Sequence, residues 1–204
     1  MDVNKISILD YGLGNIHSIE KSILKLGYNS IVIDNEKDLL DSTHLILPGV
    51  GSFEHAMEIL KEKKLDIAIK KYVQQGKPIL GICLGMQLLF ESSEENGFHL
   101  GLSILKGKVV AFKKNKDYTV PQVQWNKVLC NGYLFNDIKQ DSFFYFLHSY
   151  YVDTKNEDYI VSFSKYNNID YVSAIEYKNI FAVQFHPEKS SETGLKLIEN
   201  FIRR

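Results

Sequence analysis

The 204-residue sequence predicts an α/β fold, a single three-layer domain with a mixed, mostly parallel central sheet, helices on both of its faces and an added antiparallel β region. Two observations predict this fold. In the first half of the chain, short β-rich runs alternate with segments of helical periodicity, which is typical of parallel strands connected by helices. After Gly107, β-like runs follow one another with turn signals between them, which indicates antiparallel pairing. We find no convincing linker, so one domain over residues 1–204 is expected.

Each element of the first half has a local reason. Short apolar runs predict strands at residues 5–9, 30–33, 44–47 and 78–82. Residues 15–26 carry isoleucine or leucine at helical spacing and end before Gly27, a helix stop signal. Helices are also predicted over residues 53–75, with a break near Lys63, and over residues 84–91.

The second half is predicted to be mostly strands. They cover residues 109–112, 119–120, 143–152, 159–163, 171–177 and 180–185. Turn dipeptides such as Asn131-Gly132 separate these strands, which are expected to extend the same sheet. A last helix is predicted over residues 191–202, and the lysine-rich run at residues 113–116 is expected to be a solvated turn.

Composition narrows the function. The net charge is -1, so no strong field favours nucleic acid or a membrane surface as a partner. The first residues lack the layout of a signal peptide, and no apolar run is long enough to span a bilayer. Two cysteines, Cys83 and Cys130, make no disulfide framework, so a reduced, cytoplasmic setting is expected.

Cys83 is the first candidate for catalysis. The segment Gly81-Ile82-Cys83-Leu84-Gly85 has the form of a nucleophile elbow, in which a strand turns sharply into a helix. The helix N-terminus and a nearby histidine would activate the thiol, and the Leu84 amide would face a developing oxyanion. Taken alone, the pattern fits a small residue in a tight turn equally well.

A histidine and a glutamate supply the missing partners. His186 and Glu188 follow a predicted strand, and Pro187 between them favours extended geometry at His186. Residues two apart in an extended segment point the same way, so Glu188 can orient the His186 ring. Together with the elbow, this pair favours a Cys83–His186–Glu188 triad over a strand-end turn with a surface acid.

A glycine-containing loop offers a second oxyanion donor. Pro48-Gly49-Val50-Gly51-Ser52 follows a predicted strand, and strand ends at one edge of such a sheet meet at a crevice. The backbone amide of Val50 or Gly51 would then face the oxyanion. By itself this segment is typical of an ordinary loop.

These segments together resemble a known family. LPGVGSF, GICLGMQLLF and FHPEKS, in this order, closely resemble the class I (triad-type) glutamine amidotransferases, which have a flavodoxin-like core. DYGLGN and YFLHSYY narrow the resemblance to the glutaminase subunits of imidazole glycerol phosphate synthases and their close paralogues. The resemblance covers essentially the whole chain.

The resemblance implies hydrolysis of glutamine to glutamate and ammonia. Cys83 would form a thioester, with His186 transferring protons and Glu188 orienting it. Val50, Gly51 and Leu84 would stabilise the oxyanions. The residues that line the glutamine site in the family correspond to Gly51, Gln87, His148, Ser149 and Tyr150.

The resemblance also implies a partner, a (β/α)8-barrel cyclase in a heterodimer. The cyclase would receive the ammonia and make imidazole glycerol phosphate and an aminoimidazole carboxamide ribotide in histidine biosynthesis. Positions at or near that interface correspond to Asn15, Trp125, Tyr145 and Lys189. No cofactor is implied, and the glutaminase is expected to stay slow until the partner binds its own substrate.

One segment departs from the family pattern. Gln122 stands where the family typically has histidine, and Gln124 stands where it has glycine. Glutamine cannot adopt the positive φ angles of glycine at low cost. The ammonia acceptor therefore stays open between the histidine pathway and a paralogous role in amidating a surface-polysaccharide sugar.

Readings from other classes have weaker support. Gly12-Leu13-Gly14 imitates a dinucleotide-binding loop, with Asp34 ending the next strand, but His17 stands where the third glycine belongs. A cysteine peptidase or hydrolase would need the same Cys–His pair without the glutamine loop. A non-catalytic interaction subunit would leave Cys83 unreactive. The six histidines show no metal-ligand spacing, so no metal site is expected.

Overall fold

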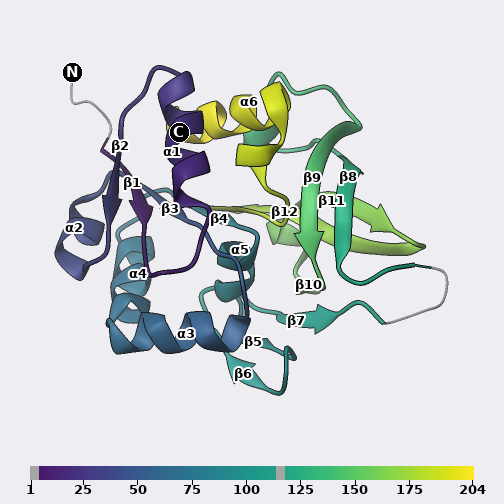
Figure 1. Cartoon of the computed structure of the whole chain (residues 1–204), viewed down its shortest axis with the longest axis horizontal. Coiled ribbons are helices and arrows are strands. Elements are labelled where there is room, and N and C mark those ends of the chain that lie inside the picture. The colour runs from purple at the N-terminus through teal and green to yellow at the C-terminus, as the bar shows by residue number, and fades with distance from the viewer. Residues whose placement is uncertain (1–4, 114–117) are drawn as a thin grey trace.

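The computed structural model describes residues 5–113 and 118–204, and it confirms the predicted α/β fold (Figure 1). Five parallel strands form one half of the main sheet, in the spatial order β2 (Ser30–Ile33), β1 (Ile6–Leu9), β3 (His44–Leu47), β4 (Ile79–Ile82) and β13 (Ile180–Val183). β4 therefore lies between β3 and β13, in the middle of the sheet. Residues 114–116 of the lysine-rich run lie outside the described residues.

The antiparallel region continues this sheet beyond β13. Antiparallel pairs join β13 to β12 (Ile169–Tyr177), β12 to β11 (Ile160–Tyr166) and to β10 (Tyr150–Asp153), and β10 to β7 (Lys108–Ala111). Two short strands, β5 (Ser92–Ser93) and β6 (His99–Leu100), complete the edge. The sequence did not predict these two strands, because two residues are too few to show periodicity.

Three predictions for the second half were wrong. β8 (Gln122–Val128) and β9 (Ser142–His148) pair only with each other as a separate two-stranded sheet among the described residues. Residues 119–120 are not a strand, since β8 begins only after Pro121, which has no N–H for a ladder. The run predicted as one strand over residues 143–152 breaks at Ser149 into β9 and β10.

Helices cover both faces of the parallel half (Figure 1). On one face lie α1 (Ile16–Lys25) and α6 (Ser191–Ile202); on the other lie α2 (Glu36–Asp41), α3 (Phe53–Glu62), α4 (Leu65–Gln74) and α5 (Leu84–Leu88). The predicted break near Lys63 is confirmed, because Lys64 adopts a left-handed conformation between α3 and α4. α2 was not predicted, and α5 ends earlier than expected. Short 3-10 turns occupy Tyr133–Phe135, Glu157–Tyr159 and Pro187–Lys189.

The core has two parts, one on each side of the sheet. Along β3, Leu45 and Leu47 pack toward α3 and α4, while Ile46 between them packs toward α1 and α6. This alternation follows from the period of two of a strand, and all four residues of β3 are buried. None of the helices in residues 5–113 and 118–204 is long and apolar enough to cross a bilayer.

Candidate active site

Cys83 occupies a sharp turn between β4 and α5. Its backbone angles are φ 54° and ψ -110°, a conformation that few non-glycine residues adopt. The turn brings backbone segments very close: a Cβ atom on Gly85 would lie 1.9 Å from the Leu47 carbonyl oxygen, and one on Gly81 would lie 2.9 Å from the Gly85 carbonyl oxygen. Gly85 therefore lets α5 approach β3, and Gly81 lets α5 lie close to β4. The turn places the cysteine at the end of the sheet.

His186 and Glu188 lie at the end of the neighbouring strand. The Cys83 amide donates to the Val183 carbonyl oxygen at 2.8 Å, which ties the elbow to the end of β13. The His186 Nδ1 atom lies 2.9 Å from Glu188 Oε1, and these side chains are only 2% and 1% exposed. His186 adopts the extended conformation that its proline neighbour predicts. The glutamate therefore fixes the ring while the chain turns into a 3-10 helix.

The protonation state of His186 depends on its charged neighbours. Its Nδ1 atom is occupied by Glu188, and its buried Nε2 atom is left to interact with the Cys83 side chain. Burial lowers the pKa of His186, but the negative charges of the Cys83 thiolate and of Glu188 outweigh it and raise the pKa to about 10. While Cys83 is a thiolate, His186 therefore holds its proton at neutral pH and can deliver it to a leaving group.

A cavity of about 250 Å³ opens in front of Cys83. The predicted oxyanion donors Val50, Gly51 and Leu84 line it, and so do the predicted substrate-site residues Gly51, Gln87, His148, Ser149 and Tyr150. As the first residue of α5, Leu84 has a backbone N–H without a partner inside the helix. Segments remote in the sequence thus converge on the sulfur from β4, β13, β9 and the loop after β3.

A shared carbonyl oxygen organises one wall of this cavity. The Tyr150 carbonyl oxygen accepts from Gln87 Nε2 at 3.0 Å and from His148 Nδ1 at 2.8 Å. A carbonyl oxygen can only accept, so His148 carries its proton on Nδ1. Burial lowers the pKa of His148 to about 4, and it stays neutral at physiological pH.

The neutral His148 ring predicts a loss of stability in acid. Because its pKa is about 4 in the folded chain and 6.5 when unperturbed, the unfolded chain binds more protons between these values. The contribution of His148 to the free energy of unfolding is fully present above pH 6.5 and decreases as the pH falls towards 4, by about 3 kcal/mol in total. Urea denaturation at pH 7, 5 and 4 should show a correspondingly smaller pH dependence for His148→Leu. An equal pH dependence in both proteins would contradict the assignment.

The four predicted interface residues lie close to the triad. Trp125 of β8 is opposite Tyr145 of β9, with ring centroids 6.3 Å apart, and Lys189 Nζ lies 5.7 Å from the Tyr145 ring centroid. Asn15 Nδ2 donates to Glu188 Oε1 at 3.5 Å. Asn15 therefore contacts Glu188, and the Tyr145 ring, which Trp125 and Lys189 flank, lies 6.4 Å from the His186 ring between centroids.

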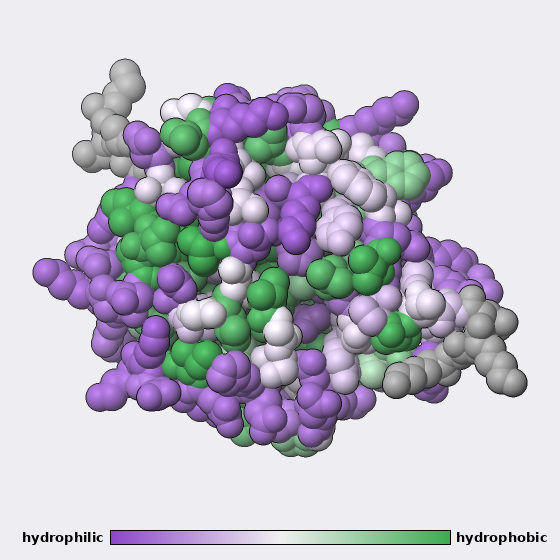
Figure 2. Space-filling model, in the orientation of Figure 1, coloured by the Kyte–Doolittle hydropathy of each residue, from purple (hydrophilic) through white to green (hydrophobic). Residues whose placement is uncertain are grey.

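An exposed apolar surface extends from these residues. Val123, Phe143 and Leu147 lie on the same face of the β8–β9 pair as Trp125 and are 37–54% exposed. In the orientation of Figure 1, Figure 2 shows hydrophobic residues among hydrophilic ones to the right of the centre, where β8 and β9 lie. We call Val123, Trp125, Phe143, Tyr145 and Leu147 the β8–β9 surface.

Sequence reasoning missed four residues at this site. Glu95, Pro121 and Leu147 line the cavity, and Gln184 contacts Cys83. The Glu95 Oε2 atom accepts from the Phe53 backbone N–H at 2.7 Å, which ties its carboxylate to the first residue of α3. For Glu95, the sequence offered one signal, the adjacent acidic residues Glu94-Glu95.

The alternative sites gain no support from their geometry. In the glycine-containing loop after β1, a Cβ atom on Gly14 would lie 3.1 Å from Pro48, and the following Asn15 contacts Glu188. This loop therefore lies against Pro48 and Glu188. In the part of the chain that the structure describes, no three His, Cys, Asp or Glu side chains gather closely enough to hold a metal ion.

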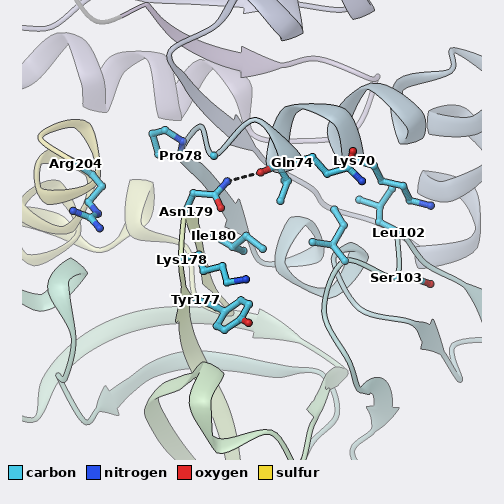
Figure 3. A pocket seen from close by; sticks show the side chains of 13 residues that line it. Lys70, Gln74, Pro78, Leu102, Ser103, Tyr177, Lys178, Asn179, Ile180 and Arg204 are labelled. Atoms are coloured by element: carbon cyan, nitrogen blue, oxygen red, sulfur yellow. Dashed lines mark hydrogen bonds between the residues drawn. The ribbon is translucent and has the colours of Figure 1, made fainter.

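A larger cavity, of about 910 Å³, lies at the opposite end of the central strands, where β4 and β13 begin (Figure 3). Its lining includes the basic residues Lys70, Lys178 and Arg204, and Asn179 donates to the Val73 carbonyl oxygen at 3.0 Å beside it. None of the triad residues lines it. Size alone therefore does not identify the chemical site of this chain.

Comparisons with known proteins show the family of this chain. Residues 7–204 match the family described as glutamine amidotransferase class-I. A relative from Methanococcus maripaludis, named imidazole glycerol phosphate synthase subunit HisH 2, is 45% identical over 202 residues, covering 98% of this chain and 99% of the relative. A HisH subunit from Sulfurimonas denitrificans is 43% identical, covering 97% of both chains.

Solved structures share the fold at lower identity. A glutamine amidotransferase structure superposes with a TM-score of 0.76 at 16% identity and covers 97% of both chains. The PurLQS structure from Thermotoga maritima has a chain with a TM-score of 0.76 at 17% identity, covering 98% of this chain and 97% of its own. The family match covers nearly the whole chain. The chain belongs to the class I glutamine amidotransferase family and is a glutamine-hydrolysing enzyme.

Proposed function

We propose that this chain hydrolyses glutamine through a Cys83–His186–Glu188 triad and passes the ammonia to a (β/α)8-barrel cyclase partner in histidine biosynthesis. The observation that carries the proposal is the buried His186–Glu188 pair, 2.9 Å apart, at the cavity that holds Cys83. A free cysteine on a strained turn, a charged histidine and an orienting carboxylate are what nucleophilic acyl transfer needs.

The reaction proceeds through two acyl-transfer steps. The Cys83 thiolate attacks the side-chain amide carbon, a C–S bond forms, and the negative charge moves to the amide oxygen. When the C–N bond breaks, His186 protonates the leaving ammonia. Water then attacks the thioester while His186 accepts its proton, and the C–S bond breaks to release glutamate and the thiolate. The Leu84 amide and a Val50 or Gly51 amide stabilise both oxyanions.

The cavity fits the polar ends of glutamine. Glu95 is the carboxylate among the cavity-lining residues, and it can bind the α-ammonium group of the substrate. Gln87, Ser149 and Tyr150 present amide, hydroxyl and backbone groups to the remaining polar atoms. A volume of about 250 Å³ is small, and it suits a single amino acid better than a peptide. This size favours a glutaminase over a cysteine peptidase.

The β8–β9 surface supports the proposal that this chain binds a partner protein. Exposed aromatic and aliphatic side chains beside an active site are typical of a protein interface. The relatives named as HisH are subunits of a synthase by name, which supports a second subunit for this chain. A cyclase docked here would lie over Trp125, Tyr145 and Lys189, next to the triad, where ammonia is released.

Gln124, which stands where the family typically has glycine, causes no backbone strain. Gln124 lies in the regular ladder of β8, opposite Phe146, and its φ is not positive. A glycine is not required at this position, so the replacement does not argue against the histidine-pathway partner. Amidation of a surface-polysaccharide sugar remains the alternative acceptor role, and the experiment below distinguishes the two.

Glutamate release from glutamine tests the proposal. The chain should be assayed alone and then with the histidine-pathway barrel cyclase of the same genome and the cyclase's substrate. We expect stimulation of at least about tenfold, because assembled amidotransferases couple their two sites. Glutaminase activity that this cyclase cannot stimulate would favour the sugar-amidation role. Full activity of the isolated chain would contradict the expected dependence on a partner.

A further inference from the structure

Gln184 lies directly beside the cysteine elbow. β13 pairs with β4 in parallel, with Val183 opposite Ile82, so the next residue of each strand comes side by side. These residues are Gln184 and Cys83. Gln184 is completely buried, and burial of an amide is unfavourable unless both of its ends find hydrogen bonds.

The hydrogen bonds around Gln184 fix the orientation of its amide group. Gln87 Nε2 donates to the Tyr150 carbonyl oxygen at 3.0 Å, and since that oxygen can only accept, this end of Gln87 is its nitrogen. The same nitrogen lies 3.0 Å from Gln184, so the Gln184 atom that faces it is the oxygen Oε1. The Gln184 NH₂ group therefore faces the other way, towards Cys83.

The sulfur of Cys83 has two contacts of opposite character. Gln184 Nε2 donates to Cys83 Sγ at 3.7 Å, while the Leu147 carbonyl oxygen lies 3.7 Å from the same sulfur as an acceptor. The carbonyl oxygen can bind the thiol but repels a thiolate, whereas the N–H group binds the thiolate more strongly than the thiol. The Gln184 contact therefore strengthens in the charge state that attacks glutamine.

We propose that Gln184 is a positioning residue for Cys83: its N–H group holds the thiolate in place for attack, and its own orientation is locked through Gln87 to the Tyr150 carbonyl oxygen. Gln184 touches the sulfur but transfers no proton. This inference rests on the proposed role of Cys83 as the nucleophile. It assigns a function to a buried residue outside the triad and outside the oxyanion donors.

The pH dependence of Cys83 alkylation tests the proposal. The rate of iodoacetamide labelling of Cys83 is measured from pH 5 to pH 10 in two proteins: the Cys130→Ala parent and the same protein with Gln184→Met. The parent with Cys83→Ala added serves as the unlabelled blank. Methionine keeps the length of the side chain but donates no hydrogen bond. We expect the midpoint of the labelling profile to rise by about one pH unit, since a hydrogen bond to a charged group contributes about this much.

Gln122→Met is the matched control. Gln122 is also a completely buried glutamine, but its side chain interacts with the Tyr171 hydroxyl and not with Cys83. We expect the labelling profile of this variant to stay unchanged. If Gln184→Met does not fold, Gln184→Glu keeps the oxygen that faces Gln87 and replaces the donor by a second oxygen, so its midpoint should also rise.

The outcomes separate this inference from the proposed function. Equal labelling profiles for the parent and Gln184→Met would overturn the role of Gln184 and leave the triad intact. An equal rise in Gln122→Met would overturn it as well, since the effect would then be a general one of core substitution. Absence of Cys83-dependent glutamate release would overturn the proposed function itself. A rise confined to the Gln184 variants, with roughly tenfold slower glutamate release, would support both.

Discussion

Cys83→Ala is expected to lower the rate of glutamine hydrolysis at least about 10⁴-fold, because the thioester cannot form without the sulfur. His186 and Glu188 would remain in place, but neither forms a covalent intermediate in the proposed mechanism. Glutamate release in the presence of the cyclase partner and its substrate measures the loss. The variant should still fold, since alanine removes only a small side chain that is 6% exposed.

Cys130→Ala is the control for this prediction. Cys130 is also buried, but its Sγ donates to the Val128 carbonyl oxygen at 3.3 Å, and burial raises the pKa of its thiol. Its recorded partners among the described residues are Gln140 and Val128 and not a histidine, so its removal should leave the rate of glutamate release nearly unchanged. Residual glutamate release by Cys83→Ala within tenfold of the parent would contradict the triad. A large loss in Cys130→Ala would show that the assay reports folding and not chemistry.

The parallel half of the fold could be predicted because its signals are local. β1, β3 and β4 are mostly apolar runs, and α1, α3 and α4 have clear periodicity and end at glycines or short breaks. The order of the elbow and the His–Pro–Glu segment predicted that Cys83 and His186 meet, since parallel strands bring their carboxyl ends to one edge. Cys83 and His186 both line the cavity at that end of the sheet.

The antiparallel half could be predicted less well because pairing is not a local property. β8 and β9 form their own two-stranded sheet, and nothing in either segment alone says which strand it will pair with.

In the parallel half, α2 was missed for another reason: it has only six residues, although Asn35 caps it by accepting from the Asp38 backbone N–H at 3.0 Å. The capping residue Asn35 is visible in the sequence, but six residues are too few to show the helical periodicity that would predict α2.

Gln184 shows what single-segment reasoning leaves out of a site. In the sequence it is one polar residue between Val183 and Phe185, which fits an ordinary strand end. Its contact with Cys83 depends on the register between β13 and β4, and its orientation depends on Gln87 and on a carbonyl oxygen of β10. Three segments separated by many residues must be placed before this role becomes visible.

Gly85→Ala is expected to destabilise the chain by more than about 3 kcal/mol, because the new Cβ atom would lie 1.9 Å from the Leu47 carbonyl oxygen. That oxygen belongs to the backbone of β3 in the centre of the sheet, so it cannot move aside as a flexible side chain would. Relief requires α5 to move away from the sheet, and Cys83 would move with it. Urea denaturation measures the loss of stability.

Gly76→Ala is the control for this effect. Gly76 follows α4 with a positive φ of 76°, but a Cβ atom there would meet nothing within 4 Å. Its cost is the backbone strain alone, about 1–2 kcal/mol. Equal losses in the two variants would contradict the steric argument. If the losses differ as expected, the two parts of the Gly–x–Cys–x–Gly segment have separate roles: Cys83→Ala removes activity and keeps the fold, whereas Gly85→Ala removes stability and keeps the nucleophile. Gly85 then serves the close approach of α5 to β3, and the chemistry belongs to the cysteine that this approach puts in place.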